Sequence, residues 1–250
     1  MTPITPTPSP TPNGLPGAYY MAQGPEQRGT GDDLSACGLV VWNMDLDPAA
    51  CRTAWPNAEN LAYFNLRWIG PYGADDSVYG KLRAWFPDDA DYWTDATGAR
   101  IGVWPGTEEL KYTPATAQRM ALFAVRFLGG WDGIYLDDLH AADLAKSHLT
   151  ALGVPAEDWE RVRGDFRRYR DTFASTIRAL LPASKLLVAN VGNEAAKVRH
   201  LGLDGVCCEE WWKADQAAFT AECGNYRAEF CVAWEWDAGK VARPGNIRYR

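Results

Sequence analysis

Two stretches of the chain share a pattern that ends in a pair of acidic residues. The first runs from Trp131 to Asp138 and reads Trp-Asp-Gly-Ile-Tyr-Leu-Asp-Asp. The second runs from Leu203 to Glu210 and reads Leu-Asp-Gly-Val-Cys-Cys-Glu-Glu. Each is an Asp-Gly turn followed by a short apolar run, which predicts a buried strand. An ionised carboxylate at the end of such a strand must stay near water or find a partner, so we expect both acidic pairs at the rim of a cleft.

The parity of the strands decides which acids face each other. Successive side chains of a strand point to opposite faces, so Asp137 shares a face with Tyr135, and Glu209 takes the same place on the second strand. Two facing carboxylates are the minimum for acid/base and nucleophilic chemistry at an acetal centre, such as a glycosidic bond. Asp138 and Glu210 have the opposite parity, and we expect them to cap, orient or hydrogen-bond the first pair.

The surrounding sequence predicts the elements that position these acids. Short apolar runs alternate with helical patterns, which is typical of parallel βαβ units. Besides the strand before Asp137, predicted strands cover residues 38–43, 61–66, 101–104, 186–190, 205–209 and 228–233. Apolar residues at helical spacing predict a helix that begins after the cap Thr113, and a longer helix over residues 155–181.

This alternation predicts an α/β fold, a (β/α)8 TIM-like barrel of ordinary length. Its eighth unit is expected to be irregular or incomplete, because only a short tail follows Asp237, and residues 17–20 are a candidate to fill the gap. An open doubly wound sheet is the alternative. Residues 1–17 read as a Thr/Pro-rich linker or tail, and residues 18–250 as a single catalytic domain.

Composition excludes several classes of function. The 250 residues carry a formal net charge of −7, which disfavours nucleic acid as a partner. No apolar run is long enough to insert into a membrane. No dinucleotide-binding or phosphate-binding motif is present, so we expect no cofactor. The linker-like start favours a secreted or cell-surface setting, although the chain shows no signal peptide.

The cysteines and histidines give weaker signals. Cys37 with Cys51, and Cys223 with Cys231, are spaced to close modest loops, which leaves one or two disulfides, or none, open. No histidine lies near a cysteine, so we expect no zinc or other metal site. The three histidines are expected at the surface or in loops, and they are His140, His148 and His200.

Polar and aromatic residues recur near the carboxyl ends of the predicted strands. In a barrel these ends open on one face, where active sites are built. The chain has twelve tryptophans, and aromatic rings stack on the C–H faces of sugars. The candidate substrate-binding residues are Trp42, Asn43, Asp45, Trp104, Tyr135, Asp138, Asn190, Glu210, Trp234 and Glu235. We expect the asparagines, Asp45 and Glu235 to hold sugar hydroxyls, and the tryptophans to form platforms.

Several short phrases together resemble a known family. They are Tyr-Trp-Thr-Asp-Ala-Thr-Gly at 92–98, Val-Trp-Pro-Gly at 103–106, Val-Ala-Asn at 188–190, and the phrases that contain Asp137 and Glu209. Their order is similar to that of glycoside hydrolases of the hypothetical glycosyl hydrolase type, which are related to the endo-α-1,4-polygalactosaminidases. The resemblance implies a TIM-like barrel with a catalytic pair at Asp137 and Glu209. The chain departs from the pattern in its short C-terminus and in the Cys207-Cys208 pair.

The leading hypothesis is a glycoside hydrolase that cleaves an O-glycosidic bond in a polysaccharide or surface glycan. Asp137 would be the nucleophile or base and Glu209 the proton donor, or the reverse, with no cofactor. Two alternatives remain. One is a non-catalytic glycan-binding or structural barrel module of a surface or virion assembly. The other is a divalent-metal hydrolase that uses both acidic pairs, which is disfavoured because no histidine ligand accompanies them.

Overall fold

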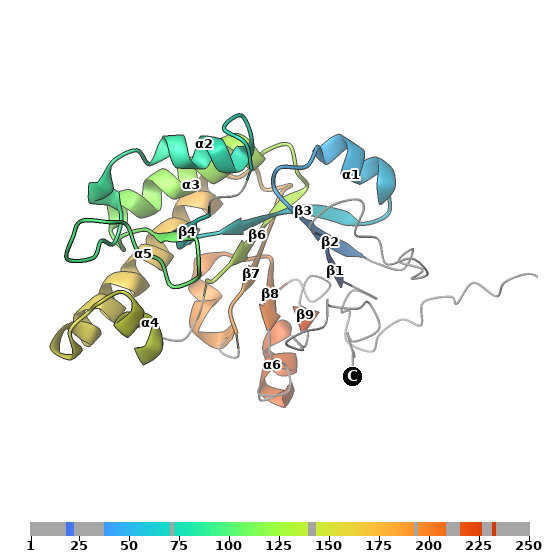
Figure 1. Cartoon of the computed structure of the whole chain (residues 1–250). Coiled ribbons are helices and arrows are strands. Elements are labelled where there is room, and N and C mark those ends of the chain that lie inside the picture. Colours follow the sequence, from blue (N-terminus) through green and yellow to red (C-terminus); the bar gives the residue numbers. More distant parts are fainter. Residues whose placement is uncertain are drawn as a thin grey trace, which may run out of the picture.

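The centre of the molecule is a curled parallel sheet (Figure 1). The computed structural model describes residues 19–22, 38–70, 73–139, 144–192, 195–208, 216–226 and 232–233. Seven described strands form the sheet, and they are β1 (Tyr19–Ala22), β2 (Leu39–Trp42), β3 (Glu59–Asn65), β6 (Gly133–Asp137), β7 (Leu186–Asn190), β8 (Gly205–Cys208) and β9 (Val232–Ala233). Every neighbouring pair is parallel.

The strands follow one another in space in the same order as in the chain. A doubly wound sheet would reverse that order at a switch point, so the described strands instead have the singly wound arrangement that barrels use. The N-terminal segment supplies β1, which pairs with β2 at the edge where a substitute strand was expected. No pairing that closes the barrel occurs among the described residues. The tail after Asp237 lies outside them.

One predicted strand is wrong. Residues 101–104 form no strand, and the chain instead makes a small antiparallel sheet of β4 (Trp68–Ile69) and β5 (Glu108–Glu109). The reason is a tight turn, in which the N–H of Thr107 donates to the carbonyl of Trp104 at 3.1 Å. A Cβ at Gly102 would lie 2.1 Å from the carbonyl oxygen of Thr107, so only glycine fits there.

Helices cover one face of the sheet (Figure 1). Those described are α1 (Pro48–Ala54), α2 (Val78–Trp85), α3 (Pro114–Leu128), α4 (Lys146–Ala151), α5 (Trp159–Leu180) and α6 (Gln216–Cys223), with 3-10 helices η2 (Asp89–Asp91), η3 (Ala156–Asp158) and η4 (Ala195–Leu201). The predicted cap is confirmed, because the Thr113 hydroxyl accepts the N–H of Thr116 at 3.1 Å. Within the described ranges, no helix has the length and apolarity needed to cross a bilayer.

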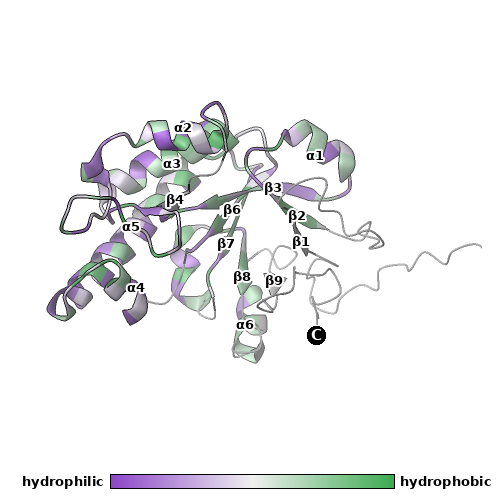
Figure 2. Ribbon diagram, in the orientation of Figure 1, coloured by the Kyte–Doolittle hydropathy of each residue, from purple (hydrophilic) through white to green (hydrophobic). Residues whose placement is uncertain are grey.

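The core between the helices and the sheet is aromatic. Phe64 of β3 stacks on Phe123 of α3 and on Phe173 of α5, with ring centroids 6.2 and 6.1 Å apart. All three rings are fully buried. The helix ribbons carry both polar and apolar residues (Figure 2), as expected when one stripe faces a core and the other faces solvent. This packing fixes α3 and α5 against the strands that carry the candidate site.

The opposite face of the sheet, here called the inner face, has its own apolar cluster. It consists of Leu39, Val41, Leu61, Tyr135, Leu186, Val188 and Cys207, with Tyr63 packed against it. Side chains two residues further along a strand lie on the same face. Tyr63, Asp137 and Asn190 therefore occupy the carboxyl end of the inner face.

The Asp-Gly phrase before β6 holds neighbouring elements together at the other end of the sheet. Asp132 Oδ2 accepts the N–H of Asn60 on β3 at 3.0 Å, and Asp132 Oδ1 accepts from Arg52 of α1 at 2.8 Å. The backbone N–H of Asp132 also donates to the carbonyl of Asn60 at 3.0 Å. The aspartate thus fastens a strand and a helix, and does not only stabilise a local turn as Asp-Gly sequences usually do.

The second Asp-Gly phrase repeats these contacts before β8. Asp204 Oδ2 accepts the N–H of Leu187 on β7 at 2.9 Å and pairs with Arg178 of α5 at 3.0 Å. Its backbone N–H donates to the carbonyl of Leu187 at 2.8 Å. Each aspartate therefore joins its own strand to the preceding strand and to the helix before that strand. The Asp-Gly part of the repeated sequence pattern therefore has a structural role.

Candidate active site

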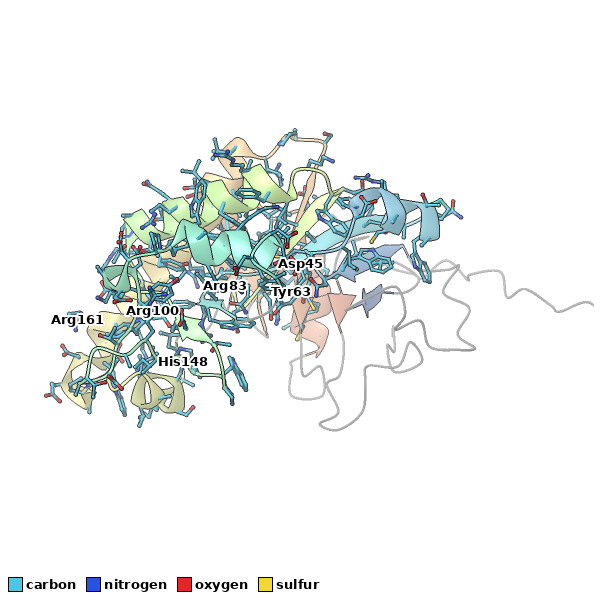
Figure 3. All side chains as sticks on the ribbon, turned by 45° about the horizontal axis from the view of Figure 1, so that its top comes forward. Asp45, Tyr63, Arg83, Arg100, His148 and Arg161 are labelled. Atoms are coloured by element: carbon cyan, nitrogen blue, oxygen red, sulfur yellow. The ribbon has the colours of Figure 1, made fainter. Side chains whose placement is uncertain are left out.

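Asp137 lies at the carboxyl end of β6 and accepts three hydrogen bonds. The Tyr63 hydroxyl donates to Asp137 Oδ2 at 2.5 Å. Asn190 Nδ2 and the backbone N–H of Asp138 both donate to Asp137 Oδ1, each at 2.9 Å. The order of the strands produces this arrangement, because β6 lies between β3 and β7. On the β3 side, Asn65 is the register partner of Asp137. Figure 3 shows Tyr63 where the strands meet in the middle of the view.

Two opposing effects act on the acidity of Asp137. Burial raises the pKa of its carboxyl, and the like charge of Asp138 raises it further. The bonds from Tyr63, Asn190 and the Asp138 N–H lower it, but the net pKa remains above the ordinary value. Burial and Asp137 hold the pKa of the Tyr63 hydroxyl well above its usual range, so Tyr63 stays a donor. Perturbed acids of this kind are typical of active sites.

The Asp138 carboxylate contacts residues at and just beyond the end of β3. The φ of Asp138 is 60°, which lies in the left-handed region that few residues other than glycine adopt. Asn65 Nδ2 donates to Asp138 Oδ2 at 2.6 Å, and Trp68 Nε1 donates to the same oxygen at 3.2 Å. Arg67 approaches Asp138 Oδ1 at 3.4 Å. The Asp138 carboxylate thus contacts three residues at and just beyond the end of β3, and its expected role beside Asp137 stays a prediction.

Behind Asp138 lies a buried charged network centred on Arg67. Arg67 Nε donates to Glu109 Oε1 at 3.0 Å, and Arg67 Nη2 lies 2.8 Å from Nδ1 of His148. The Tyr112 hydroxyl donates to the same Glu109 oxygen at 2.5 Å. Burial alone would raise the pKa of Glu109, but Arg67 and its other partners hold it below the ordinary value. Glu109 is therefore a carboxylate in the protein interior.

The prediction for His148 is wrong. His148 of α4 is only 8% exposed and belongs to the Arg67 network, so it is neither a surface nor a loop residue. Figure 3 labels His148 on the side of the molecule that carries α4. His200 fits the expectation better, since its side chain is 56% exposed and lies beside Asp171. His140 is outside the described residues.

Three candidate binding residues at and just beyond the end of β2 make structural contacts. Trp42 is 1% exposed, packs on the helix side, and donates from Nε1 to Asn60 at 2.8 Å. It cannot offer a ring face to a sugar there. Asp45 Oδ1 accepts the N–H of Tyr79 at 3.1 Å in the first turn of α2, so this carboxylate caps a helix. Asn43 Oδ1 accepts the N–H of Asp45 at 2.9 Å in a local turn.

The remaining described candidates differ in exposure. Asn190 is 1% exposed and contacts Asp137 directly, so it belongs to the site. Tyr135 is fully buried in the inner-face cluster and stacks on Tyr63 with ring centroids 6.3 Å apart, which makes it a support for that residue. Trp104 is 59% exposed in the loop before β5. Its open ring remains compatible with a platform.

Four candidate residues lie outside the described part of the chain, namely Glu209, Glu210, Trp234 and Glu235. Their side chains, and the separation between Asp137 and Glu209, stay predictions. The last described residue before Glu209 and Glu210 is Cys208 of β8, and the last before Trp234 and Glu235 is Ala233 of β9. In β8, Cys207 pairs in register with Asn190. No cluster of three or more potential metal-binding His, Cys, Asp or Glu side chains occurs among the described residues. Cys51 is a buried thiol whose pKa burial raises to about 11.

The residues that sequence reasoning missed all come from the end of β3 and just beyond it. Tyr63, Asn65, Arg67 and Trp68 contact the acidic pair, yet only the strand itself was predicted. A signal existed, because Tyr63 and Asn65 alternate with Leu61 on one face of an apolar strand that ends in polar residues. Their partners are more than 70 residues away in the chain, so the alternation alone could not identify the contacts.

The comparisons with known proteins give weak likenesses. No family model and no curated protein matches the sequence, so the resemblance to the hypothetical glycosyl hydrolase type stays a prediction. Ega3 of Aspergillus fumigatus, solved with galactosamine, has a TM-score of 0.49 at 14% identity and covers 89% of this chain and 78% of that one. The glycoside hydrolase domain of PelA from Pseudomonas aeruginosa has a TM-score of 0.43 at 15% identity, covering 87% and 92%.

A third solved structure, the GH36 alpha-galactosidase AgaA from Geobacillus stearothermophilus, has a TM-score of 0.49 at 11% identity. The match covers 92% of this chain but 36% of that enzyme. Solved structures similar to this chain thus include glycoside hydrolases. Because the three TM-scores lie below 0.5, these similarities do not establish a function for this chain.

Proposed function

We propose that the chain is a glycoside hydrolase that cleaves an O-glycosidic bond in a polysaccharide or surface glycan. The observation that carries the proposal is the Asp137 carboxylate, which stands at a strand end with three donors and a raised pKa. Carboxylates with a tuned pKa at the carboxyl ends of parallel strands are the usual equipment for this chemistry. The similar glycosidase structures agree with the proposal without carrying it.

The donors indicate which role Asp137 takes. The donors to both oxygens of Asp137 favour its ionised form and so partly offset the rise in pKa that burial and Asp138 cause, which suits a nucleophile or general base. Glu209, the acid on the neighbouring side of the proposed cleft, would then protonate the departing glycosidic oxygen. A gap of about 5 to 5.5 Å would let Asp137 attack the anomeric carbon, and a gap of about 6.5 to 9.5 Å would admit a water that Asp137 deprotonates.

The setting of this chemistry is part of the same proposal. The singly wound sheet would continue into a TIM-like barrel, with β1 beside β2 in the place of a conventional last strand. Residues 18–250 would form one catalytic domain behind a linker at 1–17, in a secreted or cell-surface protein. Trp104, with its exposed ring, would be a sugar platform at the rim.

The test is the release of reducing ends from a panel of polysaccharides by wild type, Asp137→Asn and Asp132→Asn. Both substitutions replace one carboxylate oxygen by an amide nitrogen. Asp132 directly precedes β6, and Asp137 is its last residue. We expect wild type and Asp132→Asn to release sugars, and Asp137→Asn to lose activity by a factor of about 10³ or more. Glycan binding without release by the wild type, unaffected by Asp137→Asn, would instead indicate a binding module.

A further inference from the structure

The Arg67 guanidinium reaches the candidate site through Asp138. The Arg67 side chain is 4% exposed, and Glu109 beside it is fully buried. The guanidinium also contacts His148, and in the described part of the chain no hydrogen bond joins the side chains of Arg67, Glu109 or His148 to Asp137. A buried ion pair is a costly device, and replacing one with apolar groups often leaves a protein equally stable. Its placement next to an acidic site therefore calls for an explanation other than stability.

We propose that Arg67 is a positioning residue for Asp137. Arg67 holds the Asp138 carboxylate, and this contact keeps the backbone of Asp138 in its left-handed conformation. That conformation directs the Asp138 N–H at Asp137 Oδ1. The proposal deepens the proposed function and rests on it for the role of Asp137. The contacts themselves do not depend on that role.

The side-chain contacts of Asp138 support its unusual backbone. Its φ of 60° lies in the left-handed region, which aspartate visits only occasionally, when its side chain finds local hydrogen bonds. In this conformation its N–H donates to Asp137 Oδ1 at 2.9 Å. Asn65, Trp68 and Arg67 contact its carboxylate. A released Asp138 would relax toward the right-handed region, and its N–H would turn away from Asp137.

The charges around Asp137 allow the proposal to be tested by titration. The described titratable groups beside its carboxyl are Tyr63 and Asp138, and Asp138 in turn contacts the network of Arg67, Glu109 and His148. Loss of Arg67 would remove the cation that offsets Asp138 and weaken the N–H bond, and both changes favour protonated Asp137. Loss of the Asp138 charge alone would remove a repulsion and favour ionised Asp137. The two lesions therefore push the titration of Asp137 in opposite directions.

The experiment is a carboxyl-carbon NMR titration of protein labelled with [13C]aspartate, with the Asp137 signal assigned by its absence in Asp137→Asn. Arg67→Gln and Asp138→Asn are compared with wild type. Asparagine tolerates the left-handed region and can still accept from Asn65. Arg178→Gln is the matched control, since it breaks the arginine–aspartate pair with Asp204 at the opposite end of the sheet. No substrate is needed, so the result does not depend on glycosidase activity.

Arg67→Gln leaves the buried Glu109 without its cation, and this variant can fail to fold. The double variant Arg67→Met/Glu109→Gln is therefore titrated as well, because it replaces the ion pair by two neutral side chains. We expect the Asp137 midpoint to rise by about one pH unit in the Arg67 variants and to fall by a similar amount in Asp138→Asn. Arg178→Gln should leave it unchanged. A midpoint that stays at the wild-type value in the folded Arg67 variants, or that moves the same way in Asp138→Asn, overturns the proposal.

Discussion

Tyr63 and Asp137 lie on neighbouring parallel strands and share a 2.5 Å hydrogen bond at the carboxyl end of the inner face. Because the phenol stays protonated, it supports the ionised form of a carboxylate that burial and Asp138 push toward protonation. The stack of Tyr63 on Tyr135, a buried residue, restricts the ring that carries the hydroxyl. The pair therefore helps to set the ionisation of the carboxylate to which the proposed function assigns the chemistry.

Tyr63→Phe should raise the pKa of Asp137, because one bond to the ionised form is lost. If Asp137 acts as a carboxylate, activity is lost as the pH falls through this pKa, and the acidic limb of the pH profile should move to higher pH. A lost bond of about 1.4 kcal/mol corresponds to roughly tenfold lower activity at acidic pH. The pH dependence of kcat/KM measures the shift.

Tyr92→Phe is the control for that experiment. The Tyr92 hydroxyl donates to the carbonyl of Phe86 at 2.8 Å, so the substitution also removes one buried tyrosine bond. Stability should fall while the acidic limb stays in place. An acidic limb that moves equally in both variants, or moves to lower pH in Tyr63→Phe, would contradict the role assigned to Tyr63.

The pH dependence of stability offers a test that requires no substrate. The folded pKa of Asp137 lies above its unfolded value, so the protonated form favours folding. Its contribution is fully present below the unfolded pKa near 3.8 and is lost as the pH rises through the higher folded pKa. Asp137→Asn cannot show this loss. Urea unfolding from about pH 3 to pH 8 should therefore show wild type losing stability relative to Asp137→Asn. A relative gain by the wild type would show that the pKa is lowered.

The close approach of β6 and β7 predicts that Gly133→Ala is strongly destabilising. A Cβ at Gly133 would lie 2.4 Å from the carbonyl oxygen of Leu186, so strand backbone would have to shift. We expect a loss of about 2 to 3 kcal/mol, measured by denaturant unfolding. Gly164→Ala in α5 is the matched control, since only arginine tips lie within 4 Å of its Cβ, and a gain of about 0.5 to 1 kcal/mol is expected. Equal effects would refute the register of these strands.

The repeated aspartates before β6 and β8 are predicted to serve the fold. Asp204→Ala removes the bonds to Leu187 and Arg178, so unfolding free energy should fall by about 1 to 3 kcal/mol. Activity per folded molecule should stay at the wild-type level, because this aspartate lies at the opposite end of the sheet from Asp137. Thermal unfolding and reducing-end assays of the same samples separate the two effects. A folded variant without activity would place Asp204 in the function.

Much of the fold could be predicted from the sequence where local signals are strong. The strand at 186–190 has the predicted bounds, and the Thr113 cap begins a helix as expected. The failures arise where distant residues decide the outcome. The apolar run at 101–104 looks like a strand, but the turn to Thr107 folds it against other segments. Likewise, the sequence around His148 does not predict its contact with Arg67, which lies 81 residues away in the chain.

The candidate site was predictable in part for the same reason. An acid at the end of an apolar strand is visible in the sequence, and Asp137 and Asn190 do meet. The prediction that Trp42 is a sugar platform is wrong, because strand parity sends its ring to the helix side, where it is buried. For Asp45, which also contacts the first turn of α2, a role in binding stays a prediction. The parity itself was available, since Val41 and Leu39 alternate with Trp42.

The central claim is that Asp137 works together with Glu209 across one cleft. A crystal structure of the Asp137→Asn variant with a bound oligosaccharide measures this most directly, through the distance between the side-chain oxygens of residue 137 and the Glu209 carboxylate. We predict a distance between about 5 and 9.5 Å, with a glycosidic bond between the two groups. A distance beyond about 12 Å, or side chains that face different surfaces, would contradict the account.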